Sequence, residues 1–272
     1  MPFITVNNVQ LHYRLSGRRN GPRIAFANSL GSDLRIWGEV EQRLDQDFEM
    51  LFFDQRGHGL SEVTDQPYTI SQLAADLLGL LDIIGWRQVS LCGVSVGGMV
   101  AMEAAAQRPD RVTRLVLLDT ATKIGTAAGW NDRISAIETS GIPIVSEQIL
   151  TRWFPLEYRM REPRAWEVWR RMLESTADRG YINTCLALRD ADLTAAAGRL
   201  AVPTLVMAGG NDQSTPPELV AATAGQIAGS RFENIPGAGH LPCIDAPDVL
   251  AGAIEAFCQI RESIRSPAIA HS

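Results

Sequence analysis

Short apolar runs alternate along the chain with longer stretches in which apolar residues recur every three or four positions. The short runs predict strands, and the longer spacing predicts helices. Asn7-Asn8 separates the first two strands and is typical of a tight hairpin turn. The predicted strands are Phe3–Val6, Gln10–Leu15, Arg23–Ala27, Phe48–Phe53, Val89–Gly93, Val112–Leu118, Thr204–Gly209 and Ser230–Ile235. The predicted helices are Ile36–Leu44, Thr69–Ile84, Gly97–Gln107, Pro216–Ile227 and Asp248–Ser263.

Some predicted strands are apolar almost without interruption, as in Val112–Leu118. Such strands are covered on both faces, which favours a parallel sheet with helices on its two sides. Residues 122–191 are helical in pattern and predict no strand. We therefore predict an α/β fold with a mostly parallel eight-stranded sheet flanked by helices and a helical cap inserted after strand 6. Its core would comprise residues 1–121 and 192–265, its cap residues 122–191 and a flexible tail residues 266–272.

Composition and charge exclude several kinds of partner. Of the 272 residues, 46% are hydrophobic and 21% are charged, which is typical of a folded domain. The formal net charge is −6 and no basic cluster is visible, so we expect no nucleic-acid partner. No apolar run approaches the ~20 residues that span a bilayer, so we expect no membrane contact. A monomer or a small homo-oligomer is expected.

Lysine and cysteine usage narrows the chemistry further. The single lysine, Lys123, is followed by Ile124, so no GxxxxGK[ST] phosphate loop exists and Schiff-base chemistry would depend on Lys123 alone. The N-terminal residues lack a signal-peptide pattern, and the four cysteines form no CxxC pair, which predicts a reducing, cytoplasmic location. There is no HExxH motif, and the histidines do not cluster at ligand spacing. We expect no metal and no cofactor.

The strongest chemical signal is the sequence G-V-S-V-G at Gly93–Gly97, between a predicted strand and a predicted helix. A G-x-S-x-G motif in this context forms a sharp, strained turn that presents the serine hydroxyl at the start of the helix. The dipole of that helix favours negative charge there. The motif predicts Ser95 as a nucleophile.

A nucleophilic serine needs a base, and the chain has only four histidines. His240 follows the last strand, so it should lie at the carboxyl edge of the sheet together with Ser95. The other three are in the hairpin (His12), in an Arg-Gly-His-Gly loop (His58) and near the C-terminus (His271). We predict His240 as the base.

The base needs a carboxylate to orient it. Asp212 follows the strand Thr204–Gly209, and the order Ser95, Asp212, His240 is the chain order of an α/β-hydrolase triad. We predict Asp212 as the third member, with Asp119 and Asp245 as alternatives.

Two backbone N–H groups are predicted to stabilise the negative charge on an attacked carbonyl. One is the N–H of Val96, the residue after the nucleophile, and the other that of Leu30, in the loop after the third strand. The polar, glycine-rich segment Asp54–Gly59 is interpreted as a structural turn that supports the site. Cys92 lies beside the motif in a strand and is interpreted as a small core residue.

The cap holds four of the six tryptophans. Trp130 and Trp153 are candidates for lining the pocket, with core packing as the alternative. Trp166 and Trp169 are expected to pack within the cap or onto the sheet. Arg133 and Arg189 are candidates for binding an acidic substrate, because guanidinium groups match carboxylates, although surface ion pairs are common.

Together these motifs resemble the α/β-hydrolase superfamily over nearly the whole chain. A narrower set resembles the 3-oxoadipate enol-lactonases: the sequence N-S-L-G at Asn28–Gly31, the segment Thr120–Gly125 with Trp130-Asn131, and Gly180-Tyr181 with Leu188–Asp192. The resemblance implies a serine hydrolase that opens 3-oxoadipate enol-lactone, a small acidic lactone, to 3-oxoadipate in the catabolism of protocatechuate and catechol. It carries the triad over onto Ser95, Asp212 and His240.

Two other functions remain open from the sequence. The first is a general carboxylesterase or other serine hydrolase that uses the same triad on a different substrate, with haloperoxidase-like turnover as a possible side reaction. The second is a ligand-sensing receptor of this fold that turns over slowly or not at all. The order and context of the triad residues favour an enzyme.

Overall fold

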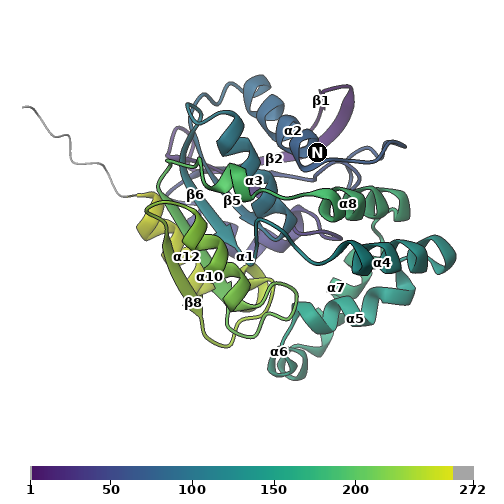
Figure 1. Ribbon diagram of the computed structural model, residues 1–272. Coiled ribbons are helices and arrows are strands. Elements are labelled where there is room, and N and C mark those ends of the chain that lie inside the picture. Colours follow the sequence, from purple (N-terminus) through teal and green to yellow (C-terminus); the bar gives the residue numbers. More distant parts are fainter. Residues whose placement is uncertain (1, 260–272) are drawn as a thin grey trace, which may run out of the picture.

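The computed structural model describes residues 2–259, whose strands form one eight-stranded sheet in the order β1-β2-β4-β3-β5-β6-β7-β8 (Figure 1). The pairs β1–β2 and β2–β4 are antiparallel, and the other five neighbouring pairs are parallel. The predicted mostly parallel sheet is therefore confirmed. The strands are β1 Phe3–Val6, β2 Val9–Gly17, β3 Arg23–Ala27, β4 Glu49–Phe53, β5 Val89–Val94, β6 Val112–Leu118, β7 Thr204–Gly209 and β8 Arg231–Ile235.

Helices cover both faces of this sheet. Helices α2, α3 and α10 lie on one face, whereas α1 and α12 pack against each other on the other. In the core the helices are η1 Leu34–Trp37 (a 3₁₀ turn), α1 Gly38–Leu44, α2 Ile70–Ile83, α3 Val96–Gln107, α9 Thr194–Ala197, α10 Pro217–Gln226, α11 Pro242–Asp245 and α12 Pro247–Cys258. Within residues 2–259, no helix is both long enough and apolar enough to cross a membrane.

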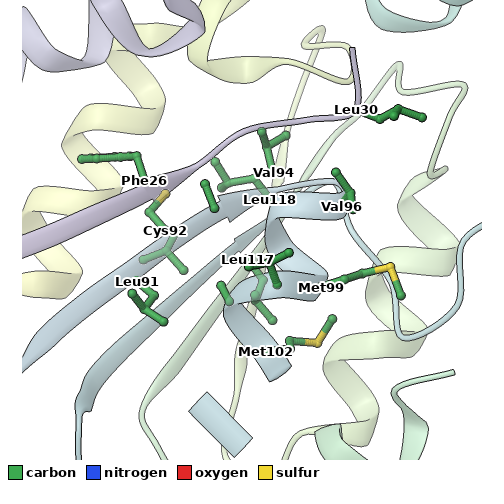
Figure 2. Close-up of a cluster of buried hydrophobic side chains, with 14 of the residues drawn as sticks. Phe26, Leu30, Leu91, Cys92, Val94, Val96, Met99, Met102, Leu117 and Leu118 are labelled. Atoms are coloured by element: carbon green, nitrogen blue, oxygen red, sulfur yellow. The ribbon is translucent and has the colours of Figure 1, made fainter. Parts of the chain in front are cut away.

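The centre of the sheet is buried and mostly apolar, as the apolar runs predicted. Every residue of β5 and of β7 is buried. Figure 2 shows buried side chains on and around the central strands and α3: Phe26, Leu91, Cys92, Val94, Val96, Met99, Met102, Leu117 and Leu118. Because β5 to β8 are parallel, the residues that follow them meet at one edge of the sheet.

Two element boundaries differ from the prediction. The stretch Ile36–Leu44 was expected to be one helix, but its first two residues belong to η1 and the rest to α1. The helical segment also starts earlier than predicted, at Leu34, because the Asp33 side chain caps η1 by accepting from the Arg35 N–H at 3.0 Å. The short helix α11 was not predicted, because four residues carry no periodic signal. The predicted last helix is observed up to Cys258, and residues 260–265, the predicted tail and His271 lie outside the described residues.

The region between β6 and β7 is helical and contains no strand, as predicted. The helices of the cap, which precede α9 in this region, are α4 Ala127–Ser140, α5 Pro143–Trp153, α6 Leu156–Arg161, α7 Pro163–Glu174 and α8 Asp178–Asp190, and they form the group toward the lower right of Figure 1. The N–H of Leu193 donates to the Thr122 carbonyl oxygen at 2.8 Å, which ties the two ends of the insertion together. The exact domain boundaries stay a prediction.

Trp166 and Trp169 of α7 pack inside the cap. The Trp169 Nε1–H donates to the Tyr158 hydroxyl at 3.1 Å, and the Trp166 ring lies edge-on to Phe154, with centroids 6.2 Å apart. Trp169 therefore holds α7 against α6, and Trp166 packs α7 against the end of α5.

Candidate active site

Ser95 lies in a strained turn between β5 and α3. Its backbone has φ +58° and ψ −122°, a conformation that a non-glycine residue adopts only when the surrounding structure imposes it. The Ser95 N–H donates to the Leu118 carbonyl at 2.9 Å, and the Thr120 hydroxyl donates to the Ser95 carbonyl at 2.6 Å. Both bonds come from the neighbouring strand and its loop, and they fix the turn.

The two glycines of the motif allow this turn to form. A Cβ atom on Gly93 would lie 2.2 Å from the Gly97 carbonyl oxygen, and one on Gly97 would lie 2.2 Å from the Ala27 carbonyl oxygen. Real Cβ atoms do not approach oxygen so closely, so any side chain at either position would push β3, β5 and α3 apart.

Hydrogen bonds to the cap helix α5 and to α11 hold the backbone at His240. Its backbone N–H donates to the Trp153 carbonyl in α5 at 2.8 Å, and the preceding Gly239 N–H donates to Asp245 Oδ2 at 2.6 Å. The ring Nδ1 lies 2.8 Å from Asp212 Oδ2. Since a carboxylate can only accept, Nδ1 carries the proton of a neutral ring and Nε2 is free to accept one.

Asp212 is buried and accepts several hydrogen bonds. Its Oδ1 accepts from the Ser214 N–H at 2.6 Å, and its Oδ2 lies 2.6 Å from the Thr215 hydroxyl. Burial raises the pKa of Asp212, but His240, Thr215 and the Ser214 N–H outweigh it and hold the pKa below its ordinary value. The group is therefore a carboxylate at neutral pH and can orient His240.

The two alternative acids have different positions. Asp245 holds Gly239, and no hydrogen bond joins its side chain to His240. Asp119 accepts from the Gly209 N–H at 2.7 Å and offers an atom within 4.8 Å of Asp212 and His240, but the carboxylate hydrogen-bonded to the His240 ring is that of Asp212. The geometry therefore favours Asp212 as the orienting acid.

A cavity of about 520 Å³ lies between the core and the cap. Ser95 and His240 line it from the core side, and Leu30 lies beside them. Helices α4, α5 and α8 line the other side, so a bound molecule would contact the serine, the histidine and the cap together.

The loop that carries Leu30 is clamped by the side chain and backbone of Asn28. Its Nδ2 donates to the Phe53 carbonyl at 2.8 Å, its Oδ1 accepts from Trp37 Nε1 at 2.8 Å, and its carbonyl accepts from Gln55 Nε2 at 2.7 Å. The last bond gives the Asp54–Gly59 turn the supporting role that was predicted for it.

Leu30 and Val96 remain our proposal for the two donors to the oxyanion. Within residues 2–259, the Leu30 N–H has no protein acceptor. Val96 is the first residue of α3, so its N–H has no partner within the helix. The Val96 side chain is fully buried in the cluster of Figure 2, so its contribution to the cavity would be its backbone.

The four predicted cap residues divide into two groups. Trp130, Arg133 and Trp153 line the cavity. Arg189 does not: its guanidinium group binds both oxygens of Asp190, at 2.7 and 2.9 Å, and Asn131 Oδ1 at 3.2 Å. The prediction that Arg189 binds the substrate is therefore not supported, because this side chain lies outside the cavity.

Arg152 and Tyr181 are among the cavity residues that the sequence did not predict. Arg152 precedes Trp153 in α5 and lines the cavity, but nothing in the helical pattern distinguishes it from other exposed arginines. Tyr181 also lines it, and burial raises the pKa of its hydroxyl while the nearby Arg133 opposes the rise. The sequence also assigned no role to Thr215, whose hydroxyl lies 2.6 Å from Asp212 Oδ2.

Cys92 is fully buried, and burial raises the pKa of its thiol well above the ordinary value. A thiol of this kind is not ionised at neutral pH, which agrees with its interpretation as a core residue.

Comparison with known proteins agrees with this geometry. A model of the alpha/beta hydrolase family matches residues 24–253. The chain belongs to the alpha/beta hydrolase family. The matched region extends from β3 to β8 and includes the cap. The predicted fold class is confirmed, and the chain is an enzyme, a hydrolase of the alpha/beta type.

Individual relatives of this alpha/beta hydrolase carry more specific names. 3-Oxoadipate enol-lactonase 2 of Acinetobacter baylyi is 30% identical over 253 residues, which cover 93% of this chain and 94% of the relative. The enol-lactonase from Burkholderia xenovorans LB400 is 36% identical, with a TM-score of 0.92 over 94% of this chain and 99% of that one. A thermophilic esterase from Thermogutta terrifontis, solved with malate, is 28% identical, with a TM-score of 0.88 over 94% and 97%. The predicted resemblance to enol-lactonases is confirmed.

Proposed function

We propose that this hydrolase opens 3-oxoadipate enol-lactone, using Ser95, His240 and Asp212. The observation that carries the proposal is the composition of the cavity, in which the serine and the histidine face cap residues that include two arginines, Arg133 and Arg152. The enol-lactonase relatives, at 30% and 36% identity over most of the chain, support the same substrate.

The two arginines suit an acidic substrate. Within residues 2–259, neither forms an ion pair with a protein carboxylate within 4.0 Å, although Asp132 also lines the cavity. The Arg133 guanidinium lies over the Trp130 ring, 5.1 Å from its centroid, which holds it in place without using its charge. A guanidinium without a carboxylate partner is suited to bind the carboxylate of a ligand.

The first half of the reaction forms an acyl-enzyme. Ser95 Oγ attacks the lactone carbonyl while His240 Nε2 takes the serine proton, and Asp212 stabilises the resulting imidazolium. The negative charge on the carbonyl oxygen is stabilised by the N–H groups of Leu30 and Val96. The C–O bond of the ring then breaks and leaves an enol on the same chain, protonated by His240. Since the enol tautomerises to a ketone, reversal is unfavourable.

The second half releases the product. His240 takes a proton from a water molecule, which attacks the ester carbonyl and releases Ser95 with its proton restored. The product is the open-chain oxo-diacid. Arg133 would hold the original carboxylate of the substrate through both halves, so that the acyl carbonyl does not move away from Ser95.

The test compares two lactones that have the same ring, only one of which carries a carboxylate. We would measure kcat/KM for 3-oxoadipate enol-lactone and for α-angelica lactone, which has the same enol-lactone ring with a methyl group in place of the carboxymethyl group. A charge-assisted hydrogen bond of roughly 1.5–3 kcal/mol predicts a preference of about 10- to 100-fold for the acidic lactone.

Equal rates on the two lactones, with faster turnover of open-chain neutral esters, would contradict the proposal. They would instead support the general carboxylesterase reading, which the similarity to the Thermogutta terrifontis esterase also favours.

A further inference from the structure

A second carboxyl group, that of Asp119, lies beneath the candidate triad. It follows β6 and is completely buried. One of its oxygens, Oδ1, accepts from the Gly209 N–H at 2.7 Å. The other oxygen, Oδ2, is also buried, but no N–H or O–H group within residues 2–259 donates a hydrogen bond to it. An unpartnered carboxylate oxygen in such a place would be costly, so the group requires an explanation.

The groups around Asp119 are acidic or neutral, apart from the imidazole. Asp212 comes from the loop after β7, His240 from the loop after β8, and Cys243 and Asp245 from α11. Burial, followed by the charge of Asp212, raises the pKa of Asp119 well above its ordinary value. Two carboxylates this close in a buried site do not both ionise readily, and Asp212 is the one that His240, Thr215 and Ser214 stabilise as a charge.

We propose that Asp119 is a positioning residue that keeps a proton on Oδ2 and donates it in a hydrogen bond to the Asp212 carboxylate. The pair then shares one proton and one negative charge. This assignment gives Oδ2 its partner, and it adds a donor to Asp212 beside His240 and Thr215. No proton is transferred during turnover: Asp119 acts by keeping Asp212 charged and fixed, and Asp212 in turn orients His240.

Backbone contacts hold Asp119 for this role. Its φ is +43°, in the left-handed region, and the Thr215 hydroxyl lies 2.8 Å from its carbonyl oxygen. Thr215 thus contacts both acids. Asp119 does not line the cavity, so substrate binding itself should not depend on it.

The first test does not require activity. We would record the infrared spectrum of the folded enzyme at neutral pH and subtract that of Asp119→Asn. The proposal predicts a carbonyl band of a protonated carboxylic acid in the wild-type protein that Asp119→Asn lacks. A difference spectrum with only ionised carboxylate bands at this position would overturn it.

The second test uses kinetics on p-nitrophenyl acetate, so it rests on the proposed serine hydrolysis but not on the lactone as substrate. Asn is nearly isosteric, tolerates a positive φ, accepts from Gly209 with its oxygen and donates with its NH₂ group. Asp119→Asn should therefore keep kcat and the acid limb of the kcat/KM profile within about 3-fold and 0.3 pH unit of wild type. Asp119→Gly, which is unstrained at this φ, should lower kcat about 10- to 100-fold with little change in KM.

Two results would overturn the positioning role. One is an Asp119→Gly enzyme as active as wild type. The other is an Asp119→Asn enzyme whose acid limb moves by clearly more than about 0.3 pH unit from that of wild type, since that would show that a charge was lost. Loss of turnover in wild type on every ester and lactone would contradict the proposed function instead, and it would leave the infrared result intact.

Discussion

The two walls of the cavity are built differently. On the core side, Ser95, Asp212 and His240 are each at most 6% exposed, and hydrogen bonds to neighbouring strands and loops fix each of them. On the cap side, Arg133 is half-buried and held by the face of Trp130, whereas Arg152 is exposed. On the core side, the hydrogen-bonded backbone thus fixes the positions of the reacting atoms. On the cap side, the charged groups stand on long side chains that can change rotamer. Chemistry and substrate choice should therefore respond separately to mutation.

Removal of the nucleophile should have the largest effect. Ser95→Ala should lower kcat by about 10⁴-fold or more on both acidic and neutral substrates, because every productive step passes through the hydroxyl. Its thermal unfolding midpoint should stay within a few degrees of wild type, since the Ser95 side chain forms no hydrogen bond to protein among the described residues. Near-normal turnover would remove Ser95 from the mechanism.

The next largest effect is expected on the stability of the protein, from a substitution in the strained turn around Ser95. Gly97→Ala places a methyl group 2.2 Å from the Ala27 carbonyl oxygen and should cost roughly 3 kcal/mol or more, with loss of activity. The matched control is Gly252→Ala in α12, where no atom lies within 4 Å of the new Cβ. That change should stabilise the protein by up to about 1 kcal/mol, because alanine favours a helix. Equal urea-unfolding midpoints for the two variants would contradict the close approach.

The same contrast explains what could be predicted from the sequence. The sheet, the turn at Ser95 and the choice of His240 followed from apolar runs, from glycine spacing and from chain order, because these constraints are local or set by topology. Which residues of the cap line the cavity was harder to predict. Arg133 and Arg189 look alike in sequence, and only the contact of Arg189 with Asp190 and Asn131 excludes it from the cavity. Thr215 and the proton of Asp119 depend on contacts between loops that are far apart in the chain.

The loop that carries His240 should be sensitive to pH through Asp245. Burial raises the pKa of Asp245 from 3.8 to about 6, although the Gly239 N–H and Arg161 oppose the rise. The folded protein therefore binds a proton more tightly than the unfolded chain does. Between about pH 4 and 6, this group makes the folded state less stable as pH rises, and above pH 6 the full penalty is present.

Asp245→Asn removes that penalty and keeps an oxygen for the Gly239 N–H. At pH 8 it should raise the free energy of unfolding by up to about 3 kcal/mol, and the gain should disappear toward pH 4. Urea unfolding of both proteins across this range measures it. Asp248→Asn, at an exposed site paired with Arg43, is the control and should give no gain at pH 8. A gain from Asp245→Asn that does not change with pH would exclude titration of Asp245 as its cause.

The most direct test of the division between the two walls measures kcat/KM on the acidic lactone and on α-angelica lactone for Arg133→Gln. We predict a loss of about 10- to 100-fold on the acidic lactone alone, with the neutral lactone unchanged, whereas Ser95→Ala loses both. Arg189→Gln, whose guanidinium is already bound to Asp190, should match wild type on both substrates. An equal loss on both lactones in Arg133→Gln would contradict the account, because it would show that the cap residue supports the chemistry rather than the choice of substrate.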